Sequence, residues 1–122
     1  MSLLADKVLE PMDTKYCLVL STCPQGEVAE TLAKFLVEGH LAACVNILPG
    51  LTSVYPWEGN IETGAEALLL IKTERAVYPR LETELRGRHP YQLPEIIVID
   101  IERGLPDYLN WISQWLFTAP HS

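Results

Sequence analysis

The segment that decides the fold is residues 16–48, which read YCLVLSTCPQGEVAETLAKFLVEGHLAACVNIL. Residues 16–23 form a continuous apolar run rich in strand formers, which is typical of a strand covered on both faces. After a proline and a glycine, apolar residues recur at helical spacing over 27–38. Gly39 is expected to stop this helix, and residues 42–48 form a second strand. The segment therefore predicts a strand, a helix and a second strand.

The rest of the chain continues this pattern and adds a final helix. The expected elements are a short strand over 52–55, a turn at 57–60, a long strand over 61–73, a helix over 78–86, a strand over 96–101 and a helix over 106–116. Thr73 is expected to cap the second helix and Gly87 to stop it. The order β-α-β-β-α-β followed by a helix predicts an α+β protein, a ferredoxin-like sandwich with an additional C-terminal helix.

Length and charge limit the kinds of partner. The 122 residues suffice for one domain, expected over 16–117, with an N-terminal extension at 1–15 and a C-terminal tail at 118–122. With 9 basic and 16 acidic residues the net charge is −7, which argues against nucleic acid and against anionic membranes. No apolar run approaches the ~20 residues of a membrane span. The start of the chain lacks the pattern of a signal peptide, so we expect a cytoplasmic protein.

The three cysteines also favour a reducing compartment. An odd number of cysteines is a poor disulfide framework. Cys17 and Cys23 lie about 20 Å apart along one expected strand, too far for a bridge. A bridge from Cys44 to either of them stays open, and free buried thiols are the simpler interpretation.

The strands are apolar on both faces. In the first strand, for example, Cys17 and Val19 alternate with Leu18 and Leu20. A sheet with one solvated face would alternate apolar with polar residues. The second face is therefore expected to be covered, either by the terminal helix or by another subunit, and the long strand over 61–73 also favours pairing with a neighbour. We predict a homo-oligomer.

The chain carries no phosphate-binding, nucleophile-elbow or paired metal-ligand motif. His89 is its most informative titratable residue, because it lies in a proline-rich loop and imidazole is a common metal ligand. The alternative is a histidine that hydrogen-bonds the loop backbone. Cys23 with His89 is the one conceivable nucleophilic pair, and it has no local signature. We therefore expect no enzymatic activity.

Charged residues near the strand ends suggest a charged cluster. Lys72 closes the long strand, and Glu95 precedes the last one. Together with Arg88 they are expected to form a charged cluster at one end of the sheet, with a structural ion pair as the alternative. Tyr91 lies in the adjoining loop, where aromatic residues often anchor an interface.

Several segments in order resemble the CutA family, the divalent-cation tolerance proteins. They are LAACVN (41–46), LPG (48–50), SVY and WEG (53–55 and 57–59), LLIKT (69–73), HPY and PEI (89–91 and 94–96) and YLNW (108–111). The resemblance covers about residues 16–116. It implies a ferredoxin-like fold, a tight homotrimer with an architecture like that of PII-type signalling proteins, and a role in tolerance to copper and other divalent cations, with no established enzymatic activity.

The resemblance also implies where a ligand would bind. Family positions proposed to hold copper correspond to Ser21, Arg88 and His89, of which His89 alone matches, and Cys23 is the candidate substitute for the thiol. The expected cofactor, if one is held, is Cu²⁺ or another divalent cation at His89 and Cys23. A metal or a small anion would occupy clefts between subunits, lined by His89 with Lys72, Tyr91 and Glu95. The alternative is a stable trimeric scaffold or PII-like signalling adaptor without a metal role.

Overall fold

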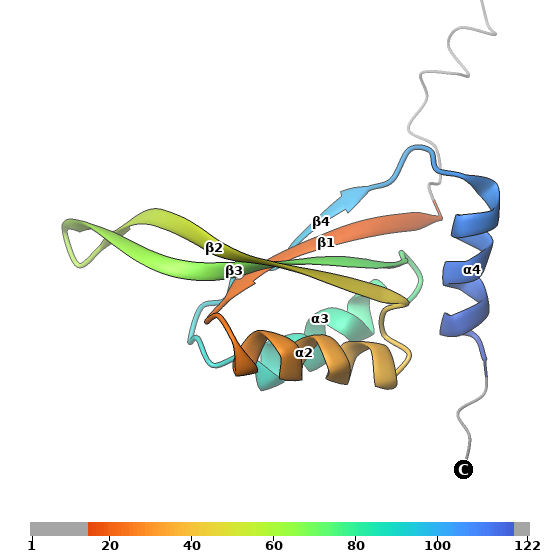
Figure 1. Cartoon of the computed structure of the whole chain (residues 1–122), viewed down its shortest axis with the longest axis horizontal. Coiled ribbons are helices and arrows are strands. Elements are labelled where there is room, and N and C mark those ends of the chain that lie inside the picture. Colours follow the sequence, from red (N-terminus) through yellow and green to blue (C-terminus); the bar gives the residue numbers. More distant parts are fainter. Residues whose placement is uncertain (1–14, 119–122) are drawn as a thin grey trace, which may run out of the picture.

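Two helices cover one face of a four-stranded antiparallel sheet in the computed structural model, which describes residues 15–118 (Figure 1). The elements are β1 (Tyr16–Cys23), α2 (Glu27–Glu38), β2 (Cys44–Trp57), β3 (Asn60–Glu74), α3 (Tyr78–Arg88), β4 (Ile97–Asp100) and α4 (Pro106–Leu116). Their order confirms the predicted ferredoxin-like arrangement with an additional helix. Nearly all of the predicted extension and tail lies outside the described residues.

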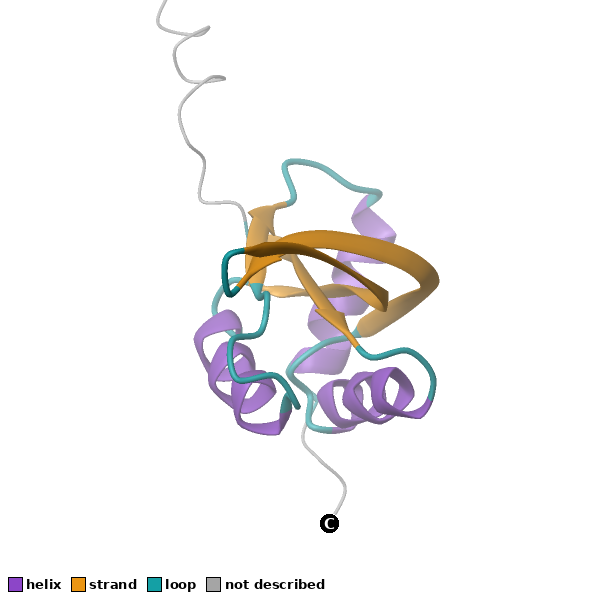
Figure 2. Ribbon diagram, turned by 90° about the vertical axis from the view of Figure 1, so that its left-hand side faces the viewer, coloured by secondary structure: helices purple, strands orange, loops and turns teal. Residues whose placement is uncertain are grey.

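The core lies between the sheet and helices α2 and α3 (Figure 2). The strands are arranged in the order β2-β3-β1-β4, so β1 and β3 form the centre of the sheet. Val19 of β1 lies opposite Ile71 of β3, and both are fully buried. Leu81 and Leu85 complete this layer from α3, as their helical spacing predicts.

No helix within the described residues 15–118 covers the opposite face of the sheet. We call it the open sheet face, and its central side chains are Leu18, Leu20, Leu68, Leu70, Ile97 and Ile99. Ile97 and Ile99 are 49% and 45% exposed, and the four leucines are partly buried. The structure thus leaves uncovered, in one chain, the face that the sequence predicts to be covered.

Helix α4 closes the end of the core and does not cover the open sheet face (Figure 1). Its Ile112 and Leu116 are buried. The indole N–H of Trp115 donates to the carbonyl of Val37 at 2.9 Å, and the ring stacks on His40 at 4.2 Å. The terminal helix therefore does not cover the open sheet face, and cover by another subunit stays a prediction.

The two expected strands over 42–48 and 52–55 are one strand, β2, with an irregular register between Leu48 and Leu51. Pro49 and Gly50 lie in this irregularity, and the Gly50 φ of +78° explains why glycine stands there. The predicted turn at 57–60 is confirmed. Beyond the helices, the β2–β3 hairpin projects as a long arm (Figure 1).

Two predicted helix boundaries are wrong. Thr73 does not cap α3, because it lies within β3 and its hydroxyl donates to the carbonyl of Leu41 at 2.7 Å. Gly87 does not stop α3, which continues to Arg88. The helix ends at Arg88 with His89 as its C-cap, because the proline that follows disfavours a helical backbone at His89. None of the helices within 15–118 is long and apolar enough to span a membrane.

Candidate functional site

The loop after α3 brings His89 to the end of β1. His89 has an extended backbone, with ψ of 136°, and its N–H still donates to the carbonyl of Leu85 at 2.9 Å. The side chain is only 8% exposed. The residue that the sequence singled out is therefore held in a fixed place at the sheet edge.

Both ring nitrogens of His89 make hydrogen bonds to the backbone. The Tyr91 N–H donates to Nδ1 at 3.1 Å, and Nε2 lies 2.9 Å from the carbonyl oxygen of Thr22. An amide N–H can only donate and a carbonyl can only accept, so the neutral ring with its proton on Nε2 satisfies both contacts. This is the alternative interpretation of His89, a histidine that fastens its own loop.

Tyr91 continues this network to β3. Its hydroxyl donates to Oε2 of Glu66 at 2.7 Å, and its ring lies 4.8 Å from that of His89. Burial and then the bond to Glu66 raise the pKa of Tyr91 well above its usual range. The sequence did not single out Glu66, because nothing local marks a carboxylate in a strand as the partner of a tyrosine 25 residues away.

Cys23 and Ser21 lie on the core side of β1, and both are fully buried. The Ser21 hydroxyl has no hydrogen-bond partner among the described residues. Burial, followed by the charge of Glu66, raises the pKa of Cys23 to about 11, so its sulfur keeps its proton at neutral pH. All three cysteines are free thiols, so the bridge left open for Cys44 does not form.

The expected charged cluster does not assemble within one chain. The Lys72 ammonium donates to the side-chain oxygen of Asn46, and Lys72 lies opposite Leu18 at the far end of β1. Along β3, Lys72 is six residues from Glu66, the partner of Tyr91, which corresponds to about 20 Å. Glu95 is exposed.

Arg88 also stays apart from this cluster, because its guanidinium lies over the Phe35 ring, 3.9 Å from the ring centroid. The ion pair that the structure shows within 15–118 joins Arg75 to Asp100 at 3.6 Å. Both of these side chains are about half exposed.

The residues at the expected metal position do not fit a divalent cation in a single chain. A cation at His89 would have to displace the Tyr91 amide or the Thr22 carbonyl, and Cys23 would have to lose a proton that burial favours. Arg88 carries a positive charge. Within the described ranges, no three His, Cys, Asp or Glu side chains are grouped so as to hold a metal.

The buried thiols lead to a prediction about alkaline pH. Burial raises the pKa of Cys17, like that of Cys23, from 9.0 to about 11. Between these values the unfolded chain loses both protons while the folded chain keeps them, so the free energy of unfolding falls as pH rises from 9 to 11, by about 2–3 kcal/mol per thiol. Urea unfolding at pH 8 and pH 10 measures about the first half of this loss.

A double variant with alanine at both positions is the control for the alkaline loss. It is expected to be less stable at pH 8, because two buried side chains are truncated. Its further loss between pH 8 and pH 10 should be smaller than that of the wild type. An equal loss in both proteins would contradict the assignment to these thiols.

The architecture and the loop network define an α+β protein of ferredoxin-like fold, with a long hairpin, an uncovered apolar sheet face and a histidine-fastened loop at the sheet edge. A sequence profile of the CutA1 divalent ion tolerance proteins matches residues 17–115. The chain belongs to this family.

Similar proteins support both the family and the fold. The divalent-cation tolerance protein CutA of Thermus thermophilus is 48% identical over 97 residues, 80% of this chain and 94% of that protein, and its structure superposes with a TM-score of 0.77. The CutA structure from Xylella fastidiosa is 45% identical, covers 84% of this chain and 98% of its own, and has a TM-score of 0.82. Protein CutA of Mus musculus is 45% identical over 93 residues, which are 76% of this chain and 52% of that protein.

Proposed function

We propose that this protein works as a homotrimer, with the open sheet faces of its three subunits packed against each other, and that it serves divalent-cation tolerance as an assembled binding protein without turnover. The observation that carries the proposal is the open sheet face. Its apolar side chains are uncovered in one chain, and soluble monomers rarely expose contiguous apolar patches of this kind. The resemblance to the CutA family implies three subunits.

The hairpin arm supports assembly independently. Val54 and Ile61 near its tip are 65% and 73% exposed, and Trp57 at the end of β2 is 60% exposed. In the part of the chain that the structure describes, the two strands of the arm pair only with each other beyond the helices. An arm of this kind is stabilised when a neighbouring subunit covers it.

We propose that the expected ligand cleft lies between subunits. Within one chain, Lys72 lies about 20 Å along β3 from Glu66, which accepts the hydrogen bond of Tyr91. The side chains of Lys72 and Tyr91 therefore cannot line one cleft. In a trimer, Lys72 of one subunit and Tyr91 and Glu95 of the next are the residues that we propose for this cleft. A small anion is a suitable occupant, because Lys72 supplies a positive charge.

Native mass spectrometry at micromolar concentration tests the assembly. The expected mass is three times the chain mass of 13.7 kDa. A mass of one chain, with no larger species at any concentration up to 100-fold higher, would contradict the proposal.

A separate titration tests the cation site. We infer that the trimer has no tight site at His89 and Cys23, because the hydrogen bonds of His89 and the proton of Cys23 oppose one. Calorimetric titration with Cu²⁺, Zn²⁺ and Ni²⁺ is therefore expected to give the same weak uptake for the wild type and for His89→Ala. Tight uptake that is lost in His89→Ala would instead establish the metal site that the resemblance implies.

A further inference from the structure

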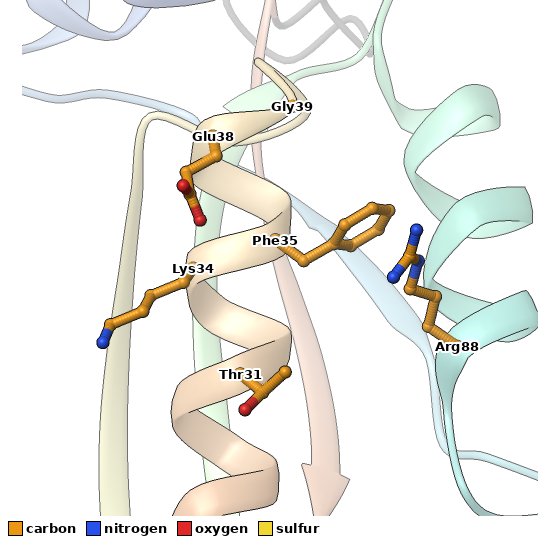
Figure 3. A pocket seen from close by; sticks show the side chains of 6 residues that line it. All are labelled: Thr31, Lys34, Phe35, Glu38, Gly39 and Arg88. Atoms are coloured by element: carbon orange, nitrogen blue, oxygen red, sulfur yellow. The ribbon is translucent and has the colours of Figure 1, made fainter.

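A shallow hollow lies between α2 and α3, on the side of the sheet away from the open sheet face. Its volume is about 500 Å³, and it is lined by Thr31, Lys34, Phe35, Glu38, Gly39 and Arg88. Figure 3 shows the Arg88 side chain rising from the end of α3 towards the Phe35 ring of α2. The hollow is open to solvent and plays no part in the proposed trimer contacts.

The Arg88 guanidinium is positioned by its stacking on Phe35. Its central carbon lies 3.9 Å from the ring centroid, a close cation–π contact. Stacking occupies a face of the guanidinium and leaves the in-plane N–H donors at its edge available. No carboxylate between residues 15 and 118 forms an ion pair with Arg88. A planar group with five donors in a fixed fork matches two oxygens of a carboxylate or phosphate.

We propose that Arg88 and Phe35 form a binding site for an oxyanion, a carboxylate or a phosphate ester, carried on a small ligand with an apolar body. The oxyanion accepts hydrogen bonds from the edge of the guanidinium, and the apolar body packs beside the Phe35 ring. This site is distinct from the cleft proposed between subunits.

The other lining residues limit the size and charge of the ligand. In Figure 3 Lys34 points away from Arg88, so its ammonium adds only longer-range attraction. Glu38 lines the same hollow and repels negative charge, which disfavours polyanions. A ligand with a single carboxylate or phosphate group therefore suits the hollow better than a nucleoside triphosphate or a nucleic acid.

Titration of the full chain, followed by the amide resonances of residues 31–39 in NMR spectra, tests the site. The probes are acetate, benzoate, inorganic phosphate and phenyl phosphate at constant ionic strength. We expect saturable shifts, with benzoate binding more tightly than acetate and phenyl phosphate more tightly than inorganic phosphate. Tighter binding of phenyl phosphate than of benzoate identifies a phosphate ester as the ligand class, and the reverse order identifies a carboxylate.

Three variants distinguish specific binding at Arg88 from nonspecific electrostatic attraction of anions. Arg88→Gln is expected to weaken binding roughly tenfold or more, because hydrogen bonds to a charged group are lost. Arg88→Lys keeps the charge and loses the planar fork, so it should also bind more weakly. Arg86→Gln removes an exposed arginine of the same helix that does not line the hollow, and it should bind as the wild type does. Shifts that do not saturate, or equal affinity in Arg88→Gln and Arg86→Gln, would overturn the proposal, whatever the mass of the assembly.

Discussion

Replacing Ile99 by lysine is expected to convert the proposed trimer into folded monomers. Ile99 lies on β4 opposite Leu18, at the edge of the open sheet face, and is 45% exposed in one chain. A lysine there reaches water in the monomer, so folding of the chain should change little. In the trimer it would place an unpaired ammonium in an apolar interface, at a cost of several kcal/mol per subunit.

The matched control is Val28→Lys. Val28 is 36% exposed and belongs to α2, on the other side of the sheet. The two variants carry the same added charge, and only Ile99→Lys alters the proposed interface. Light scattering should report one chain mass for Ile99→Lys and three for Val28→Lys, with similar far-ultraviolet circular dichroism. A trimeric Ile99→Lys would contradict packing through the open sheet face.

Much of this fold is predictable because its elements have strong local signals. β1 and α2 begin and end where the sequence predicts, since a proline and a glycine separate an apolar strand from an amphipathic helix. The strands that are apolar on both faces also predicted a covered second face. What the sequence could not decide is which element covers it, because α4 carries enough apolar residues to serve as a cover and instead packs at the end of the core.

Most of the errors arise from longer-range contacts, and one arises from a local steric effect. Thr73 resembles a helix cap, yet its hydroxyl bonds the carbonyl of Leu41, 32 residues away. Gly87 resembles a helix stop, yet the following proline sets the end of α3. The position of Arg88 could not be predicted either, because its stacking on Phe35 depends on how two helices pack.

The position of the candidate site could be predicted from the sequence, but its hydrogen bonds could not. The proline-rich loop after α3 marks His89 and Tyr91 in the sequence. Their partners, the Thr22 carbonyl and the Glu66 carboxylate, are contributed by β1 and β3, which the loop meets only after folding. Lys72 lies at the other end of β3 because the register of the sheet fixes its place opposite Leu18.

Replacing His89 by alanine is expected to destabilise the protein by about 2–4 kcal/mol. The change leaves the Tyr91 N–H and the Thr22 carbonyl without their partner, and each unsatisfied group costs about 1–3 kcal/mol when water does not replace the bond. That is a large part of a typical total of 5–15 kcal/mol. Denaturant unfolding at one fixed protein concentration measures it, because the stability of an oligomer depends on concentration.

Tyr91→Phe separates the ring contacts of His89 from the rest of the network. The substitution removes only the hydrogen bond to Glu66 and keeps the hydrogen bond from the backbone N–H of residue 91 to His89. The free energy of unfolding is therefore expected to fall by about 1 kcal/mol. Hydrogen exchange of the Tyr91 amide should become fast in His89→Ala and stay slow in Tyr91→Phe. If His89→Ala unfolds at the wild-type denaturant concentration and keeps this amide protected, the ring does not fasten the loop. The ring nitrogens of His89 would then be available to a cation, and this result would favour the metal site that the resemblance implies.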